Sequence, residues 1–381
     1  MEKVLHVIKT KKLRSDGRLL KWIESLQDYD INSEVLILED ENASSENNTD
    51  NVPIKRLSLS FRKLFSKQKG YVFKIPEYSI RCFGSIYNTK ADVILFHDVQ
   101  QYLNVLIFCL LKKLSFKKKI IWDLHELPHE ILLRFGITKR ILKYLLKNVD
   151  GVIYTNEERR LYLKDRLNCQ EKRFVVLNNY PDESFINAKH ASLPDPMSEW
   201  LDGMPYVLWM GFAGEGRNFQ SFIKIYEKHK SEFKVIIMGQ VADEFKDEIE
   251  SYIANKNVYV TFVAQSEIQK LVDNALFSVV LYPNISPNNF YCEPNRLYQL
   301  ITRKVPVIVG NNPTMLNFVK KYNAGIVLND DGTDSANLDI EMKNMSQNVS
   351  EFRTHLKEVD FSFLSWEKQF QDVYVFLNEA S

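Results

Sequence analysis

The sequence predicts an α/β protein of two domains, each built on an open parallel sheet, which face each other across a central cleft. Short apolar runs rich in Val and Ile alternate with helical patterns along the chain, which is typical of parallel strands joined by crossover helices. The runs are continuously apolar, as in strands buried on both faces. At 381 residues the chain is longer than a single domain with one hydrophobic core usually is. Ligands of such sheets bind at the carboxyl ends of the strands, which places the expected site in the cleft.

The N-terminal half carries the first series of these patterns. We expect strands at 4–8, 34–38, 92–96, 119–122, 150–154 and 174–177, and helices at 18–26, 102–114 and 157–166. The series pauses between Asp182 and Pro205, where Pro194, Pro196 and Gly203 cluster. Turn-forming residues of this kind mark a connection. The predicted N-terminal domain is therefore 1–182, followed by a linker at 183–204.

The C-terminal half repeats the alternation in a predicted domain at 205–360. We expect strands at 206–210, 234–238, 258–262, 277–281, 305–309 and 325–328, and helices at 219–229, 243–255, 266–274, 296–302 and 315–322.

Charge is unevenly distributed, although the whole chain has a formal net charge of only +1. Residues 51–148 hold nineteen Lys or Arg against six Asp or Glu, a balance of +13. One basic cluster contains Arg62, Lys63, Lys67 and Lys69, and another contains Lys112, Lys113 and Lys117–Lys119. Such a face suits an anionic membrane surface or a phosphate-bearing substrate, or it is an ordinary solvated surface. No nucleic-acid-binding signature accompanies it, so no nucleic-acid partner is expected.

The remaining bulk features predict a cytoplasmic location. Cys82, Cys109, Cys169 and Cys292 show no CxxC spacing, which favours reduced thiols. The first residues lack the apolar core of a signal peptide, and the apolar run at 105–111 is too short to span a bilayer. Any membrane would therefore be met peripherally, at its inner face.

The most informative stretch runs from Glu293 to Gln299 and continues to Pro306. A helix that begins in it would direct free backbone N–H groups, its positive dipole end and the side chain of Arg296 at one point. That point suits the phosphates of a nucleotide, and Gln299, one turn further on, could reach a ribose hydroxyl. The alternative is a plain surface loop between a helix and a strand.

Four further motifs occur in a fixed order: Ser15–Arg18, Trp122–Glu126, Asn179–Pro181, and Trp366 within Phe363–Glu367. With Gly211, Arg217, Glu293–Gln299 and Pro306, they make the chain resemble the family 4 glycosyltransferases of the GT-B fold, over nearly its whole length. The resemblance implies two Rossmann-like domains, with a C-terminal helix at 361–381 that returns to the N-terminal domain.

The resemblance also implies an activity: transfer of a sugar from a UDP- or GDP-sugar to a glycan or lipid-linked acceptor. The anomeric configuration would be retained, no metal ion or other cofactor would be needed, and surface polysaccharide synthesis would be the setting. The family's diphosphate-binding Gly-Arg pair and Lys correspond to Gly211, Phe212 and Arg217. Its two glutamates correspond to Tyr291 and Gln299, so two of the usual charged groups are changed. Glu293 and Arg296 lie nearby and could substitute.

The residues implied in this way fall into three groups. The catalytic candidates are His125, Arg217 and Arg296. The donor-binding candidates are Gly17, Gly211, Phe212, Arg217, Gly239, Val263, Tyr291, Glu293, Asn295, Arg296, Leu297 and Gln299. The acceptor-side candidates are Asp16, Arg18, His97, Asp98 and Glu126. His125 follows a predicted strand and would bind a sugar hydroxyl or the acceptor, unless it is a core or rim histidine.

Three motifs resemble metal sites but are interpreted otherwise. His125–His129 matches the HExxH signature of zinc proteases, which requires a continuous helix, and Pro128 disfavours one. Asp28-Tyr-Asp30 has the form used by metal-dependent transferases but sits in a turn, and Asp330–Gly332 is also interpreted as a turn.

Two other functions remain open. Phe212 and Gln299 would suit a GT-B scaffold that has lost catalysis and acts as a partner subunit. A sugar-nucleotide epimerase on the same fold is the other, although its acidic and histidine residues have no clear counterparts here.

Overall fold

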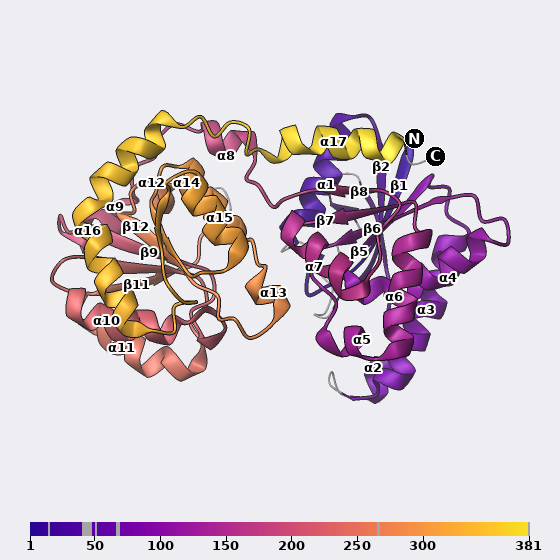
Figure 1. The fold of residues 1–381 in the computed structure, drawn as a ribbon, viewed down its shortest axis with the longest axis horizontal. Helices are drawn as coiled ribbons and strands as arrows, with labels where there is room; N and C mark the ends of the chain where they lie inside the picture. Colours follow the sequence, from indigo (N-terminus) through magenta and orange to yellow (C-terminus); the bar gives the residue numbers. More distant parts are fainter. Residues whose placement is uncertain (14–15, 40–47, 50–51, 66–68, 265–266, 380–381) are drawn as a thin grey trace. The chain divides into compact units, whose positions relative to one another are not determined.

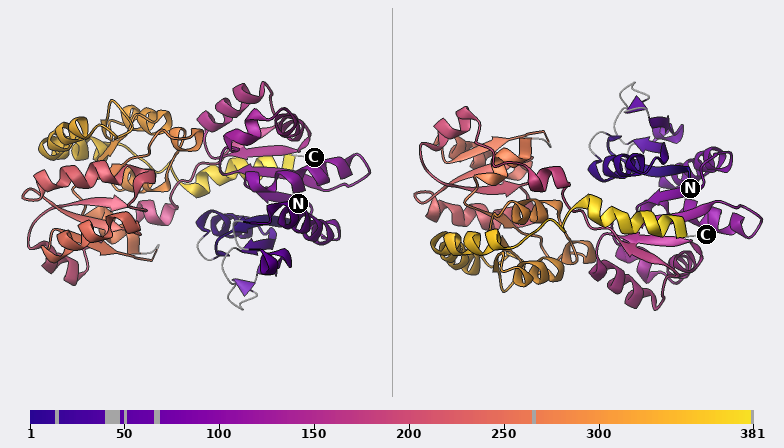
Figure 2. Two further views of the ribbon diagram at one scale, coloured as in Figure 1. Left: turned by 90° about the horizontal axis from the view of Figure 1, so that it is seen from below. Right: turned by 90° about the horizontal axis from the view of Figure 1, so that it is seen from above.

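A computed structural model describes residues 1–13, 16–39, 48–49, 52–65, 69–264 and 267–379. The chain forms two compact units (Figure 1). Unit 1 comprises Met1–Asn178 and Gln369–Ser381, and unit 2 comprises Asn179–Lys368. Residues 183–204, expected as a linker, hold helices α8 (Glu183–Asn187) and α9 (Asp195–Leu201) and belong to unit 2. Each unit contains a parallel sheet with helices on both of its sides (Figure 2), so the predicted two-domain α/β architecture is confirmed.

The sheet of unit 1 has the strand order β3-β4-β2-β1-β5-β6-β7-β8. All neighbours are parallel except β3, which pairs antiparallel with β4. The strands are β1 (Lys3–Thr10), β2 (Asn32–Glu39), β3 (Asn48–Thr49), β4 (Val52–Arg56), β5 (Val93–His97), β6 (Lys119–Leu124), β7 (Gly151–Tyr154) and β8 (Phe174–Val176). The helices that matter below are α1 (Gly17–Asp28), α2 (Phe61–Leu64), α3 (Tyr71–Tyr87), α4 (Tyr102–Lys112), α5 (Glu130–Arg134), α6 (Gly136–Asn148) and α7 (Glu157–Leu167).

The sheet of unit 2 has the order β11-β10-β9-β12-β13-β14 and is parallel throughout. Its strands are β9 (Tyr206–Met210), β10 (Lys234–Met238), β11 (Val258–Thr261), β12 (Phe277–Val280), β13 (Val307–Val309) and β14 (Gly325–Val327). The main helices are α10 (Phe219–His229), α11 (Lys246–Ala254), α12 (Ile268–Asp273), α13 (Pro287–Phe290), α14 (Asn295–Thr302), α15 (Pro313–Lys321) and α16 (Ser335–Glu358). The strand order reverses direction between β9 and β12, which is where such sheets bind ligands.

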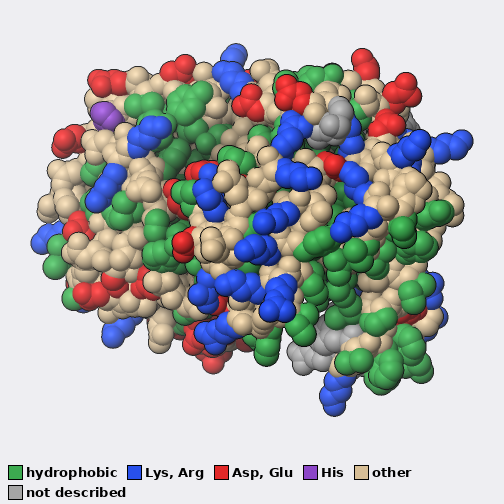
Figure 3. Space-filling model, turned by 45° about the vertical axis from the view of Figure 1, so that its right-hand side comes forward, with side chains coloured by type: hydrophobic (Ala, Val, Ile, Leu, Met, Phe, Trp, Pro, Cys, Tyr) green, Lys and Arg blue, Asp and Glu red, His purple; other side chains and the backbone are tan. Residues whose placement is uncertain are grey.

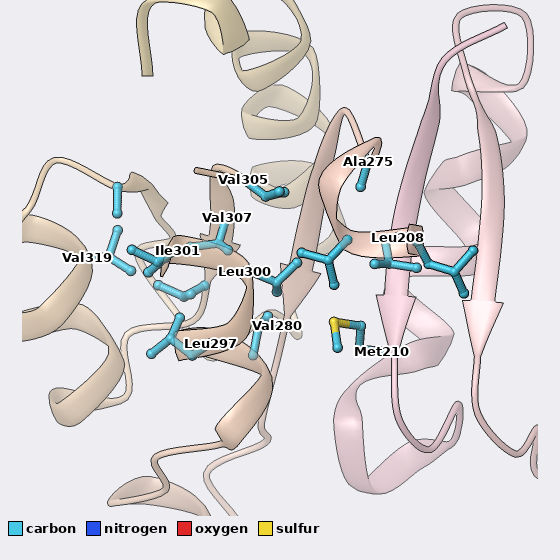
Figure 4. Packing of buried hydrophobic residues seen from close by; sticks show 14 of the residues in the cluster. Leu208, Met210, Ala275, Val280, Leu297, Leu300, Ile301, Val305, Val307 and Val319 are labelled. Atoms are coloured by element: carbon cyan, nitrogen blue, oxygen red, sulfur yellow. The ribbon is translucent and has the colours of Figure 1, made fainter. Parts of the chain in front are cut away.

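Packing of α14 against the sheet fixes where that helix begins. Leu297, Leu300 and Ile301 on α14 are fully buried in one cluster with Val280 of β12 and Val307 of β13 (Figure 4). Burial of a Leu or Ile side chain contributes roughly 1.5–3 kcal/mol. Three such residues on one helix hold its amino end beside the carboxyl ends of the strands.

The C-terminal helix α17 (Trp366–Glu379) joins unit 1 from Gln369 onward, as expected of a returning helix. Phe370 meets Trp22 edge to face with ring centroids 5.1 Å apart, and Tyr374 stacks on Tyr29 at 4.0 Å. Gly151 of β7 leaves room for Phe376, since a Cβ at that position would lie 2.2 Å from the ring. The chain therefore closes unit 1 with its own last segment.

The structure also agrees with the thiol prediction, because all four cysteines are buried and free. Within the described residues, no helix combines the length and apolar character needed to cross a bilayer.

Candidate functional site

A pocket of about 420 Å³ lies at the carboxyl ends of β9, β10 and β11 in unit 2. Met210 and Met238, the last residues of β9 and β10, form part of its wall. Six of the donor-binding candidates line it: Gly211, Gly239, Val263, Asn295, Arg296 and Gln299. The structure therefore brings together residues that the sequence separates by almost ninety positions.

Two glycines let the backbone approach closely at the pocket. Gly211 has a φ of +97°, and a Cβ there would lie 2.6 Å from Nη1 of Arg296. Gly239 has a φ of +152°, and a Cβ there would lie 2.1 Å from the carbonyl oxygen of Gly211. Side chains rarely adopt either conformation. Glycine at 211 therefore lets Arg296 lie against the end of β9, and glycine at 239 lets the two backbone segments approach each other.

Arg296 is a cation with unused hydrogen-bond donors. Its Nη1 donates to the carbonyl oxygen of Met210, whereas its Nε and Nη2 are buried and have no hydrogen-bond partner among the described residues. Burial lowers the pKa of the guanidinium, and the nearby charge of Arg217 lowers it further, against the effect of Tyr282. Arginine nevertheless stays protonated in proteins. A buried cation without a counterion is costly, so this site suits an anionic ligand.

Arg217 brings a second positive charge to the same place. Its guanidinium carbon lies 4.0 Å from the ring centroid of Tyr282, and that of Arg296 lies 4.9 Å from the same centroid. Tyr282 itself lines the pocket. The helix α14 begins there at Asn295, so its free amide groups and positive dipole end add to the field. Two guanidinium groups and a helix terminus can hold a diphosphate without a metal ion.

The remaining donor-binding candidates are not among the residues that line the pocket. Leu297, whose donor-binding assignment stays a prediction, has its side chain fully buried in the core beside Leu300. Phe212 is 42% exposed and turns its ring toward Gly214, where a Cβ would lie 2.3 Å from it. Tyr291 and Glu293 lie in the segment between α13 and α14. Gly17 is the exposed first residue of α1 in unit 1, and its donor-binding assignment stays a prediction.

Tyr282 was missed by sequence reasoning. It lies two residues after the end of β12 and is the first polar side chain after the apolar run at 277–281. That position, at the carboxyl end of a parallel strand, was the available signal.

Unit 1 contains a second candidate site around Asp123, near the carboxyl end of β6. The side chain of Asp123 is fully buried, and Arg18 binds both of its oxygens, with Nη2 2.8 Å from Oδ1 and Nε 3.2 Å from Oδ2. Oδ2 also accepts from Nε1 of Trp22 at 3.0 Å. The charge of Arg18, followed by His125 and His97, holds the pKa of Asp123 well below its ordinary value in spite of burial. Asp123 is therefore a buried, ionised carboxylate that accepts hydrogen bonds from several side chains. The sequence analysis did not identify it as a candidate.

Three histidines extend this network. His125 Nε2 lies 3.0 Å from Asp123 Oδ2, and His97 Nδ1 lies 3.4 Å from the same oxygen. His6 Nδ1 lies 2.9 Å from His97 Nε2. Since a carboxylate only accepts, both rings next to Asp123 donate to it, and His97 Nε2 then accepts from His6. The same assignment leaves His125 Nδ1 as a hydrogen-bond acceptor on a side chain that is 20% exposed.

His97, Asp123 and His125 offer ligand atoms close enough together to hold a metal ion. However, both oxygens of Asp123 already accept hydrogen bonds from Arg18, and Trp22 donates to one of them. A divalent cation bound here would be repelled by the positive charge of the Arg18 guanidinium. The donor set therefore fits a hydrogen-bond network that orients His125 better than it fits a metal centre.

The other acceptor-side candidates have local partners. Asp16 caps α1, since its Oδ1 accepts from the amide of Leu19. Arg18 donates to Asp123 and, through Nη1, to the carbonyl oxygen of Leu177 at 3.0 Å. Asp98 has a φ of +70°, uncommon for a non-glycine residue, and caps the short turn that follows β5. Glu126 is exposed. Ser15, which opens the Ser15–Arg18 motif, lies outside the described residues.

The metal-like motifs lie in turns, loops or helix ends. His125–His129 lies in the loop between β6 and α5, with His129 capping α5, so the helix that a zinc protease needs is absent from that segment. Asp28 ends α1 and Asp30 precedes β2, at the amino end of that strand. Asp330 accepts hydrogen bonds from Gly332 and Asp334 within its own turn.

Acid should destabilise unit 1 as soon as the pH falls below about 6.5. Burial, followed by the neighbouring His97, lowers the pKa of His6 well below its ordinary value of 6.5, and burial likewise lowers that of His97. The unfolded chain then takes up protons first, so the contribution of each imidazole is present above pH 6.5 and is lost as the pH falls. The loss is at most about 1.4 kcal/mol per pH unit for each ring.

Thermal melts between pH 8 and pH 5 measure this, with His6→Gln as the test variant and His190→Gln, at an exposed site, as the control. We expect the acid slope to become shallower in His6→Gln and to remain unchanged in the control. Equal slopes in wild type and His6→Gln would contradict a buried neutral His6.

The two parallel sheets, the switch point beside β9 and the returning α17 define the two-domain GT-B fold found in glycosyltransferases. Neither a protein-family model nor a curated protein matches the sequence. Solved structures do match in fold.

Sucrose-phosphate synthase from Thermosynechococcus elongatus is 13% identical and matches with a TM-score of 0.72, covering 100% of both chains. HepE from Anabaena, solved in complex with UDP, is 11% identical, with a TM-score of 0.69 over 99% of this chain and 100% of that one. The E. coli trehalose-6-phosphate structure bound with UDP-2-fluoro glucose is 12% identical, with a TM-score of 0.66 over 98% of both chains. At these identities the likeness shows the fold.

Proposed function

We propose that this protein is a glycosyltransferase that moves a sugar from a nucleotide-sugar donor to a glycan or lipid-linked acceptor. The observation that carries the proposal is Arg296, whose Nε and Nη2 are buried at the pocket without hydrogen-bond partners among the described residues. A diphosphate would supply the missing acceptors. Two structures of the same fold were solved with UDP or UDP-2-fluoro glucose, which supports a nucleotide of this kind.

Departure of a nucleoside diphosphate builds negative charge on its oxygens as the bond to the sugar breaks. Fixed donors aimed at that charge lower the barrier, because they need no reorganisation during the reaction. Arg217 and Arg296, both near the ring of Tyr282, are the residues proposed to do this. Gln299, which also lines the pocket, is proposed to bind the ribose.

His125 in unit 1 is proposed to bind a sugar hydroxyl or the acceptor. Its Nε2–H is committed to Asp123, so its Nδ1 would accept a hydrogen bond from a hydroxyl group. This is a binding and orienting role. The ionised Asp123 accepts from Nε2–H and so holds the ring in that tautomer.

The finer features of the proposal follow the family resemblance. They are retention of the anomeric configuration, independence of metal ions, a role in surface polysaccharide synthesis and a cytoplasmic location at the inner face of the membrane. The two guanidinium groups support metal independence, since they supply the charge that a metal ion would otherwise bring. Product stereochemistry measured by NMR and activity in EDTA test the first two of these features.

A correct nucleotide sugar should raise the melting temperature of the protein. At about 100 times its dissociation constant, a ligand that binds only the folded state adds about 2.7 kcal/mol. For a unit of this size, that corresponds to roughly 5–10 °C. The measurement is a thermal-shift panel of UDP- and GDP-sugars, with the free sugars and inorganic phosphate as controls.

If no nucleotide or nucleotide sugar shifts the transition, the donor-site assignment is wrong. A shift without turnover on any acceptor or water would favour the second candidate, a partner subunit that binds the donor but does not react. The exposed Phe212 in place of the family's arginine is the feature that favours this second candidate.

A further inference from the structure

Helix α3 in unit 1 exposes hydrophobic side chains along one face. Val72 is 80% exposed, Ile80 is 70% exposed and Tyr87 is 54% exposed. They recur every seven or eight residues, which places them on one side of a helix. Tyr78, Cys82 and Ile86, on the opposite side, are buried in the unit. The helix is thus apolar on both sides, although only one of them is covered by protein.

Helix α2 continues the exposed surface. Its Leu64 is 73% exposed, and the rings of Phe61 and Phe65 each lie 5.5 Å from that of Phe73 on α3. The carboxylate of Glu77 accepts from the amides of Ser60 and Phe61 and so fastens α2 to α3. We call Leu64, Val72, Phe73, Ile80 and Tyr87 the apolar ridge. Because these contacts hold both helices in place, the ridge is formed before any partner arrives.

The exposed apolar surface extends over the neighbouring helices. Helix α3 packs beside α4, α4 beside α6, and α6 beside α5. Five further exposed hydrophobic residues lie on or beside these helices: Leu110, Leu114, Ile131, Phe135 and Ile137. More than half of the large exposed hydrophobic residues in the described chain therefore fall between positions 64 and 137. Figure 3 shows hydrophobic side chains gathered at the lower right, the end of unit 1 that carries α2 in Figure 1. Surface concentrations of this kind mark interaction sites.

Basic side chains accompany the ridge. Lys63 and Lys69 are exposed beside it, and Lys113, Lys117, Arg134 and Arg140 are exposed along the adjoining helices. The acidic residues near it are already paired: Glu77 with Arg81, and Glu130 with Arg166. Lys67, which the sequence groups with this cluster, lies outside the described residues. The surface is therefore both apolar and positively charged.

We propose that this surface docks on an anionic lipid bilayer, with the apolar ridge entering the boundary between headgroups and acyl chains. A bilayer offers both features that the surface needs, a hydrocarbon layer for the ridge and anionic headgroups for the lysines and arginines. A second copy of the chain would bring the same positive charge and repel the first. The docking does not depend on the donor pocket in unit 2, so either assignment can fail without the other.

Vesicle sedimentation of the full chain tests the proposal. One vesicle population contains equal parts of phosphatidylcholine and phosphatidylglycerol, and the other contains phosphatidylcholine alone. We expect binding to the anionic vesicles only, and binding that weakens as salt rises from 0.1 M to 1 M, because the Debye length falls from ~10 Å to ~3 Å. Equal binding to both populations, or binding to neither, would overturn the proposal.

Two double variants separate the apolar and the electrostatic parts. Val72→Asn with Ile80→Asn should lower the partition coefficient about a hundredfold, since burial of each side chain is worth about tenfold or more. Lys63→Gln with Lys69→Gln should lower it about twenty-five-fold, roughly fivefold for each charge, and should flatten the salt dependence. All four positions are exposed, so the melting temperature should stay at the wild-type value.

Ile340→Asn is the matched control, because Ile340 is 65% exposed on α16 of unit 2, away from the ridge in the chain. It should bind as the wild type does. Wild-type binding by Val72→Asn, Ile80→Asn would refute insertion of the ridge. Concentration-dependent self-association without vesicles, lost in that double variant, would show that a second copy covers the surface instead.

Discussion

Replacement of Arg296 by Met is expected to abolish the thermal shift caused by a nucleotide sugar while leaving the ligand-free protein at least as stable as the wild type. Most buried arginines are paired, and their removal leaves an opposite charge stranded. Arg296 differs, because its Nε and Nη2 have no hydrogen-bond partner among the described residues. Met would fill most of the same space without the cost of a buried charge. Retained stability combined with lost function would be the signature of a ligand-binding cation.

The kinetic effect should also be large. Loss of one fixed donor to a developing oxyanion costs about 2–4 kcal/mol of transition-state stabilisation, which corresponds to roughly 30- to 1,000-fold in kcat/KM. Arg217→Met should fall in the same range, because its guanidinium lies near the same Tyr282 ring. Wild-type turnover by the double variant would remove both residues from the reaction.

Arg303→Met is the matched control, at the residue that caps the carboxyl end of the same helix. Arg303 pairs with Asp273 at 2.6 and 2.8 Å and donates to the carbonyl oxygens of Ile186 and Ala188 at the carboxyl end of α8. Both side chains of the pair are buried. Removal of Arg303 should lower the free energy of unfolding by about 3–5 kcal/mol, because it strands a buried carboxylate. Equal stability losses in Arg296→Met and Arg303→Met would contradict the distinction between a free and a paired arginine.

Replacement of Asp123 by Asn is expected to destabilise unit 1 by about 3–5 kcal/mol, as when one partner of a buried ion pair is removed. The amide would leave Arg18 buried beside a neutral group and would turn an N–H toward donors that need an acceptor. Arg18, Trp22 and His125 all direct N–H groups at this carboxylate. Chemical denaturation at pH 7 measures the loss.

A double variant separates stability from function at this hub. Arg18→Met with Asp123→Leu removes both charges together, so it should recover much of the stability that Asp123→Asn loses. It cannot restore the acceptor for His125 Nε2–H, so activity should stay low even where the fold recovers. Full activity in the double variant would show that the orientation of His125 does not matter.

Asp123 also shows why sequence reasoning found only part of the site. Its partner Arg18 is 105 residues away, and the carboxylate becomes a hub only when β6 lies near α1. Tyr282 was overlooked for the same reason, since its role depends on Arg217 and Arg296 meeting around its ring. Leu297 lies in the motif that opens α14, but helical geometry turns its side chain into the core, which the sequence position did not indicate.

The secondary structure was predictable where burial is strong and local pattern is enough. The strand at 234–238 and the helix at 219–229 were predicted with the bounds that the structure gives. Helix α3 was not predicted: Pro76 interrupts its pattern, and its apolar residues lie on two sides rather than one. Helix α16 was missed because only Leu338, Met342, Met345 and Leu356 are buried among its 24 residues. Four buried residues spread over about six helical turns give only a weak hydrophobic periodicity in the sequence.

The sequence by itself determined the α/β class, the two parallel sheets and the stretch that opens α14, because continuous apolar strands and helix start signals are local properties of the chain. Tertiary structure alone decided that Arg296 is buried beside Gly211 with unused donors, that Asp123 joins Arg18 to His125, and that α3 leaves an apolar face uncovered. Each of these depends on which strands and helices become neighbours. Burial and pairing are properties of that neighbourhood, and no single segment encodes them.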